Sequence, residues 1–131
     1  MNIVEGNFFE MPWMEVLESD GVTHRCRKVM FQGERALVQI GEFCNGHKLK
    51  PHTHEYEQIA IIWQGVCDFF IDGVPHHMTA GSWIVIPSGA EHYIQVKDSP
   101  VPVMNMDIFI PRREENYKAY EKFLASLKEV K

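Results

Sequence analysis

The fold is decided by the stretch Gly46-His-Lys-Leu-Lys-Pro-His52-Thr-His54-Glu-Tyr-Glu-Gln58 and by a second stretch, Gly81-Ser-Trp-Ile-Val-Ile-Pro87-Ser-Gly89-Ala-Glu-His92. Side chains alternate along a β-strand, so we expect His52 and His54 to face one interior, with Gln58 on the same side. Imidazole nitrogens are common ligands of divalent transition metals, and His92 lies on a different predicted strand. The two stretches therefore predict a metal site that is completed from across a barrel.

The spacing of these residues resembles the two motifs of the cupin superfamily, G-x5-H-x-H-x3-E-x6-G and G-x5-P-x-G-x2-H-x3-N. Both spacings are met, with two changes of residue. Gln58 stands where cupins usually have Glu, and Val96 stands where they usually have Asn. The resemblance implies an all-β fold, the cupin double-stranded β-helix or jelly-roll barrel.

The composition limits the classes of protein to which the chain can belong. Its 131 residues suit one domain with its own core, so we expect a single domain over residues 1–131. The 13 basic and 18 acidic residues give a formal net charge of −5, which argues against a nucleic-acid-binding surface. Three cysteines without a C-x-x-C pair fit a reducing compartment. No stretch approaches the ~18 apolar residues of a membrane span. We expect a cytoplasmic protein without nucleic-acid or membrane partners.

Regularly spaced turn signals divide the chain into short strands and leave no room for βαβ units. An N-terminal arm over residues 1–20 is expected to form a short helical turn at 11–17 and to pack three aromatic side chains on the barrel, Phe8, Phe9 and Trp13. The barrel is expected over residues 21–110, with a hairpin at Asp72-Gly73, and a C-terminal α-helix over 112–129. The predicted strands are 22–31, 34–43, 57–64, 66–72, 74–79, 83–86, 91–96 and 101–110.

Two apolar surfaces predict a homodimer. The predicted strand 57–64 is apolar on both faces, so both faces need cover. The predicted helix carries an apolar stripe at three- and four-residue spacing, which is expected to pack on the barrel or on a partner: Tyr117, Tyr120, Leu124 and Leu127. Any part of these surfaces left uncovered would be a hydrophobic patch that pairing of two copies buries.

The residue types at the metal site indicate its chemistry. His52, His54, His92 and Gln58 are all neutral ligands, so a bound divalent ion keeps its full charge and prefers anionic ligands. Such a donor set accepts one Zn, Ni, Mn, Fe or Co ion, and it lacks the carboxylate of the facial triad of non-haem iron oxygenases. Glu55 and Glu57 are expected to point outward. The remaining histidines are expected at the solvated surface: His24, His47, His76 and His77.

A narrower resemblance includes the ends of the chain. Pro12-Trp13, the Gln58 ligand and the segment Asp107-Ile-Phe109-Ile-Pro111-Arg-Arg113 are together similar to the small cupins of pectin and alginate breakdown. That resemblance implies an enzyme that converts 4,5-unsaturated monouronates into linear keto-uronates. It also implies that Asp107, Phe109 and Arg113 line the pocket beside the metal, with Arg112 as the alternative to Arg113.

The roles that the resemblance suggests are chemically consistent. Asp107 would transfer a proton as general acid and base, and Arg113 would bind the carboxylate of a small anionic substrate. Considered without the resemblance, the two residues could simply form an ion pair at the end of a strand. Two other functions remain open: another cupin enzyme, such as a dioxygenase or a lyase acting on a small carboxylate, and a non-enzymatic metal-dependent ligand-binding or sensor module.

Overall fold

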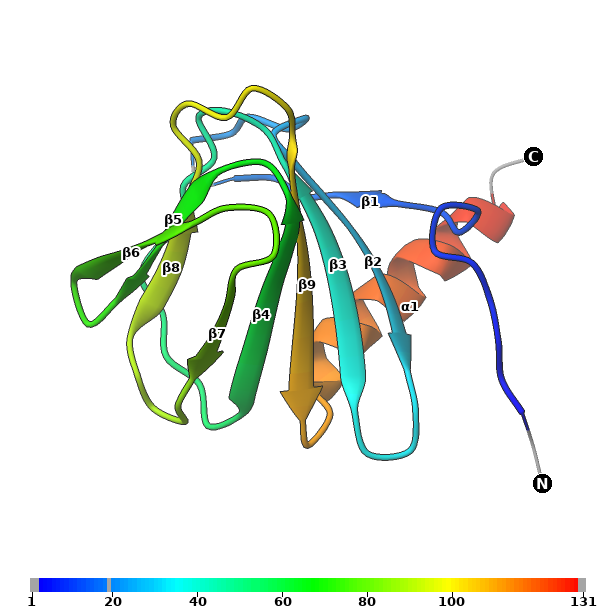
Figure 1. Ribbon diagram of the computed structural model, residues 1–131. Coiled ribbons are helices and arrows are strands. Elements are labelled where there is room, and N and C mark those ends of the chain that lie inside the picture. Colours follow the sequence, from blue (N-terminus) through cyan, green and yellow to red (C-terminus); the bar gives the residue numbers. More distant parts are fainter. Residues whose placement is uncertain (1–2, 19, 130–131) are drawn as a thin grey trace.

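The computed structural model describes residues 3–18 and 20–129, which form two antiparallel β-sheets and one helix (Figure 1). The six-stranded sheet has the order β1-β2-β3-β9-β4-β7, and the three-stranded sheet has the order β6-β5-β8. The elements are β1 (Met14–Glu15), β2 (Cys26–Gln32), β3 (Leu37–Phe43), β4 (Glu57–Gln64), β5 (Cys67–Ile71), β6 (Val74–Met78), β7 (Trp83–Ile86), β8 (His92–Gln95), β9 (Val103–Ile110) and α1 (Glu114–Glu129). No helix in the described part of the chain is long and apolar enough to cross a membrane.

Alternation along β4 gives the large sheet two different faces. The inward side chains are buried: Gln58, Ala60 and Ile62. The outward ones are half-buried: Ile59, Ile61 and Trp63. Ala60 and Ile62 belong to one core cluster with Phe69 of β5 and Ile94 of β8, so the barrel interior is closed between the two sheets. Removing a side chain such as Ile62 from water contributes roughly 2 kcal/mol.

The outer face of the large sheet has a second core, under α1 and the N-terminal arm. Tyr120 of α1 is fully buried against Val29 and Ile40, which are paired on β2 and β3. The Tyr120 hydroxyl donates a hydrogen bond to the Pro12 carbonyl over 2.7 Å, which ties the helix to the arm. The expectation that the helical stripe packs on the barrel is therefore confirmed, although Leu127 at its far end stays 44% exposed.

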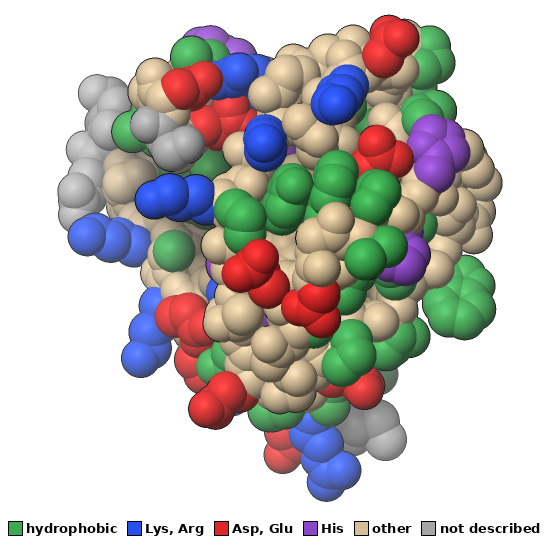
Figure 2. All heavy atoms as spheres, turned by 90° about the vertical axis from the view of Figure 1, so that its left-hand side faces the viewer, with side chains coloured by type: hydrophobic (Ala, Val, Ile, Leu, Met, Phe, Trp, Pro, Cys, Tyr) green, Lys and Arg blue, Asp and Glu red, His purple; other side chains and the backbone are tan. Residues whose placement is uncertain are grey.

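The outer face of the small sheet is not covered by α1, which lies on the opposite side of the molecule (Figure 1). Phe70 of β5 and Tyr93 of β8 stack there with ring centroids 4.6 Å apart and an interplanar angle of 3°. Figure 2 shows hydrophobic side chains gathered across the middle of this side of the molecule.

A hairpin turn and the start of the helix illustrate how local sequence sets the boundaries of the elements. Asp72 and Gly73 both have positive φ, 48° and 80°, as a type I′ hairpin requires, so the hairpin predicted between β5 and β6 is confirmed. Helix α1 begins at Glu114, two residues later than expected. The Arg113 carbonyl accepts a hydrogen bond from the Tyr117 amide, which places Arg113 at the N-cap position.

Several local predictions for the first 40 residues are wrong. The segment 11–17 contains no helical turn; it contains β1, whose Met14 pairs with Lys28 of β2. Strands β2 and β3 begin at Cys26 and Leu37, later than the expected starts at 22 and 34. In the arm, Phe8 and Trp13 pack as expected, but Phe9 is 67% exposed. Tertiary pairing with β2 outweighs the weak helical preference of this short segment.

Candidate metal centre

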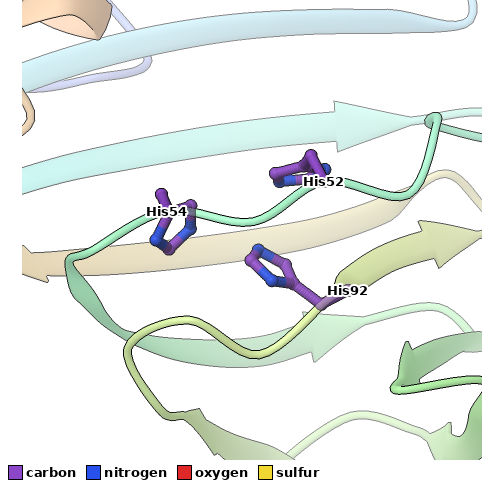
Figure 3. A group of neighbouring side chains, drawn as sticks. All are labelled: His52, His54 and His92. Atoms are coloured by element: carbon purple, nitrogen blue, oxygen red, sulfur yellow. The ribbon is translucent and has the colours of Figure 1, made fainter.

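Three histidines converge inside the barrel, and backbone bonds between the two motif stretches bring them together. His52 and His92 form an isolated antiparallel bridge, with N–O distances of 3.1 and 2.9 Å. The Gly89 amide donates to the His54 carbonyl over 2.9 Å. One ring nitrogen from each histidine lies within 4.8 Å of the others, and the rings point toward one another (Figure 3).

His52 and His54 do not lie on one regular strand, although the expected alternation of their side chains assumed strand geometry. His54 lies outside any strand, and β4 begins only at Glu57. Strand alternation alone therefore does not explain why these side chains share an interior. The bridge from His52 to His92 and the hydrogen bond from Gly89 to His54 hold this part of the backbone so that both side chains face the barrel interior.

In each ring one nitrogen faces a backbone carbonyl, which leaves the other nitrogen available to a metal. The Nδ1 atoms of His52, His54 and His92 lie 3.1, 3.0 and 2.9 Å from the carbonyl oxygens of Lys50, Tyr56 and Ala90. A carbonyl accepts only, so each Nδ1 carries the proton and each neutral ring has its lone pair on Nε2. Such outer bonds are the usual means of orienting metal-binding histidines. The Nε2 of His92 is buried and has no hydrogen-bond partner among the described residues.

Burial keeps the rings of His52 and His92 neutral. It lowers the pKa of His52 and lowers the pKa of His92 to about 4, because the charged imidazolium is poorly solvated inside the barrel. At neutral pH no proton has to leave His92 before a metal binds.

Gln58 faces the histidines with its oxygen. Its Nε2 donates to Asp107 Oδ1 over 2.8 Å, and its Oε1 lies 3.1 Å from His54 Nε2. With the His54 proton on Nδ1, two lone pairs face each other across that gap, and a cation between them would relieve the repulsion. Ligand bonds of about 2.1 Å meeting at a right angle put the two donor atoms about 3 Å apart, close to this spacing. The donor set therefore fits one divalent transition metal.

No carboxylate from the first motif joins the site. Glu55 and Glu57 are both exposed, as expected. A carboxylate from outside the two motifs, that of Asp107, contacts the candidate ligand Gln58.

A cavity of about 190 Å³ lies beside the histidines and is lined by His52, Gln58 and His92. Asp107 and Phe109 of β9, and Arg113 beyond the end of that strand, line it too. Asp107 is buried, and burial raises the pKa of its carboxyl against the opposing hydrogen bonds from Asn105 and Gln58. The Phe109 ring meets His54 edge-on at 5.8 Å between centroids. The Arg113 guanidinium lies 5.1 Å above the Phe109 ring.

Arg112 points elsewhere. It donates to the Gly33 carbonyl over 3.2 Å and pairs with Glu114 at 2.9 Å. It is not part of the cavity lining, whereas Arg113 is. Of the two candidate arginines, only Arg113 can reach a ligand in this cavity.

Four polar residues of the cavity were missed at the level of sequence: Lys28, Gln39, Asn105 and Asn116. Asn105 could have been found, because it lies two residues before Asp107 on a predicted strand and so shares its face. The other three depend on the order of strands in the sheet or on where α1 docks, and no local pattern identifies them.

One histidine prediction is wrong. His47 is fully buried and contacts the buried Glu18 carboxylate through Nδ1, with the Phe43 ring 4.5 Å away between centroids. Its turn-forming neighbourhood suggested exposure, but β-barrel closure places it inside. The other histidines without a site role are exposed, as expected: His24, His76 and His77.

Comparisons with known proteins agree with this architecture. The family model of the AraC-like ligand binding domain matches residues 40–108. Dimethylsulfoniopropionate lyase DddW of Ruegeria pomeroyi is 43% identical over 56 residues, which cover 43% of this chain and 37% of that protein. Thus only a little over a third of the length of this relative is matched.

Among solved structures, an RmlC-like cupin from Shewanella frigidimarina has a TM-score of 0.70 at 19% identity, covering 84% of this chain and 92% of that one. KdgF from Halomonas sp. also has a TM-score of 0.70, at 21% identity, covering 82% of this chain and 94% of that one. The predicted cupin jelly roll with a C-terminal helix is confirmed.

Proposed function

Since the chain belongs to the family of AraC-like ligand-binding domains and has the cupin fold, we propose that it is a metal-dependent enzyme that opens the ring of a 4,5-unsaturated uronate to give a linear keto-uronate. One observation carries the proposal. The hydrogen bond from Gln58 to Asp107 joins the candidate metal site to a buried carboxyl in a cavity that also contains Arg113. The cavity volume of about 190 Å³ suits a single small ring and not a polysaccharide chain.

The metal would be held by His52, His54, His92 and Gln58. When bound, it supplies a Lewis acid that stabilises negative charge on substrate oxygens. Because all four donors are neutral, its charge is not reduced by its protein ligands, which favours an anionic substrate.

Asp107 is suited to the proton transfers of this isomerisation. A base removes the proton of the C1 hydroxyl, the C1–O5 bond breaks, and the C5 oxygen becomes an enolate beside the carboxylate. A proton then adds to C4, which leaves an aldehyde at C1 and a ketone at C5, with no atom gained or lost. Burial raises the pKa of Asp107 above the usual value of a carboxyl, which makes the carboxylate a stronger base.

Arg113 is suited to binding the substrate carboxylate. Its guanidinium is positioned over Phe109, and its Nε lies 3.3 Å from the exposed carboxylate of Glu115. Because the Glu115 carboxylate is exposed and can return to water, exchange of this pair for a bidentate pair with a substrate carboxylate costs little. The sequence resemblance to the cupins of pectin and alginate breakdown supports the same role.

The test is an ultraviolet assay of the metal-loaded protein with unsaturated galacturonate. We expect loss of the absorbance of the conjugated double bond, without uptake of oxygen. If no unsaturated uronate is converted while metal is bound stoichiometrically, the proposal fails.

The identity to the dimethylsulfoniopropionate lyase favours a second candidate, a lyase acting on a small carboxylate. Consumption of dimethylsulfoniopropionate by the metal-loaded protein, with unsaturated uronates left unchanged, would support that candidate. The family match to ligand-binding domains supports a third, a metal-dependent binding module, for which a uronate would bind without being converted.

A further inference from the structure

Lys28 is a half-buried cation that the proposed chemistry leaves without a task. It belongs to β2, between the buried inward residues Cys26 and Met30, and it lines the cavity. Within residues 3–18 and 20–129, no carboxylate lies within ion-pair distance of its ammonium group. A lysine at the wall of a cavity without an anionic partner can donate hydrogen bonds to a ligand.

Asn105 offers a hydrogen-bond acceptor that complements the donor group of Lys28. It is only 1% exposed, and its Oδ1 is buried without a hydrogen-bond partner in the described part of the chain. The Asn105 side chain also lowers the pKa of Asp107, because its amide N–H can hydrogen-bond to the charged carboxyl and its oxygen cannot. Buried amide oxygens are rarely left unpaired, because the lost hydrogen bond with water is costly.

The sheet register places Lys28 and Asn105 on opposite sides of one residue. Gly41 of β3 pairs with Lys28 of β2 on one side and with Asn105 of β9 on the other. Two strand spacings separate them by about 10 Å, which a lysine side chain spans only in part. Gly41 has no side chain of its own, and the Phe43 ring, which also lines the cavity, lies over it, 2.6 Å from where a Cβ would be.

We infer that Lys28 and Asn105 form a subsite for a hydroxyl group of the substrate. A hydroxyl can accept a hydrogen bond from the Lys28 ammonium and at the same time donate one to Asn105 Oδ1. A carboxylate would be attracted to Lys28 but would face the Asn105 oxygen with a second acceptor. The inference rests on the proposed function and narrows its substrate class to hydroxylated acids, in contrast to a sulfonium acid without hydroxyls.

The subsite would also set the direction in which a substrate lies. On β9 the order along the cavity is Asn105, Asp107 and Phe109, with Arg113 beyond the strand end. A ligand with its carboxylate at Arg113 and a hydroxyl at Asn105 therefore has its central atoms beside Asp107. Lys28 and Asn105 act as positioning residues in this arrangement.

Direct binding tests the subsite without requiring turnover. Calorimetry on the metal-loaded protein would compare galacturonate with tetrahydropyran-2-carboxylate, which keeps the ring and the carboxylate but has no hydroxyls. We expect Lys28→Met to reduce the preference for galacturonate by about tenfold or more, the usual effect of removing a charged donor to a hydroxyl. Lys28→Arg, which keeps a donor, should retain most of the preference.

Lys97→Met is the matched control, since Lys97 is exposed in the loop after β8, and it should leave the preference unchanged. An unchanged preference in Lys28→Met, or no binding of galacturonate to the parent protein, would overturn the inference. If the preference depends on Lys28 while no unsaturated uronate is converted, the subsite stands and the proposed reaction fails. Conversion of uronates by a Lys28→Met variant with unaltered KM would preserve the reaction and remove the subsite.

Discussion

Gln58 and Asp107 are joined by a 2.8 Å hydrogen bond across the neighbouring strands β4 and β9, with the amide nitrogen donating to the carboxyl oxygen. This bond determines which end of the Gln58 amide faces the histidines. It also means that the glutamate usual at this cupin position would bring two carboxyl groups into contact. The choice of Gln at position 58 is thus coupled to the presence of Asp at 107.

Gln58→Glu should destabilise the metal-free protein by roughly 2 kcal/mol, because a buried hydrogen bond is replaced by contact between two acceptors. The loss should be larger at pH 8 than at pH 5, since protonation of either carboxyl relieves the repulsion. Thermal unfolding with and without metal would measure it. Gln64→Glu is the control, because exposed Gln64 also donates to a carbonyl, that of Pro102. Equal losses in both variants would contradict the coupling.

His52→Ala should lower metal affinity by tenfold or more, since one of four donors is lost and the remaining site is less organised. Elemental analysis of the parent protein should give about one metal per chain, and a chelator should lower its melting temperature. His77→Ala is the matched control, because His77 is exposed and its Nδ1 lies 3.1 Å from the carboxylate of Asp68, away from the candidate site. Stoichiometric metal in a His52→Ala, His54→Ala double variant would refute the ligand set.

Asp107→Asn should keep the metal and slow kcat on unsaturated galacturonate by roughly 100-fold, the size of a general acid–base contribution. Normal turnover by Asp107→Asn would remove Asp107 from the proton transfer.

Arg113→Ala should act mainly by raising KM, because it removes the partner of the substrate carboxylate. Arg112→Ala is the control and should change neither constant much, since its side chain contacts Gly33 and Glu114 outside the cavity.

His47 should make stability depend on pH. Burial lowers its pKa, against the raising effect of Glu18, while the charges of Arg25 and Lys28 lower it further. The unfolded chain therefore binds a proton more readily, so the free energy of unfolding should fall as the pH drops below about 6.5 toward the lower folded-state pKa. His47→Gln should weaken this dependence between pH 7 and 5, measured by denaturant unfolding. In contrast, exposed His76→Gln should leave it intact, and identical pH profiles for the parent and His47→Gln would contradict the assignment.

A homodimer remains a prediction, and we now propose a surface for it on β7, outside the strand 57–64 and the helical stripe that suggested it. Helix α1 uses most of its apolar stripe inside the molecule, but Trp83 and Val85 of the sheet-edge strand β7 are 68% and 44% exposed. A second copy can pair with this edge and cover both side chains. Light scattering should give about twice 15.2 kDa at micromolar concentration, and Trp83→Glu should give monomers. Val101→Glu, a change at an exposed loop residue, is the control; a monomeric parent would end the proposal.

The sequence by itself determined the features that depend on residue type and short spacing. These features are the alternating strands, the Asp72-Gly73 hairpin and the two histidine motifs. Each can be recognised within two to six residues, because side-chain direction alternates along a strand and a tight turn needs particular residue types. From these, the all-β jelly roll and the grouping of His52, His54 and His92 could be predicted.

Only the tertiary structure decided which residues meet across the barrel. The choice between Arg112 and Arg113 depends on where α1 begins, and the burial of His47 depends on barrel closure. Lys28 and Asn105 line one cavity because their strands flank β3, where Gly41 pairs with both residues. Strand order and register bring together residues that are tens of positions apart in the sequence. The packing of the whole core sets this order and register, so no local sequence pattern predicts them.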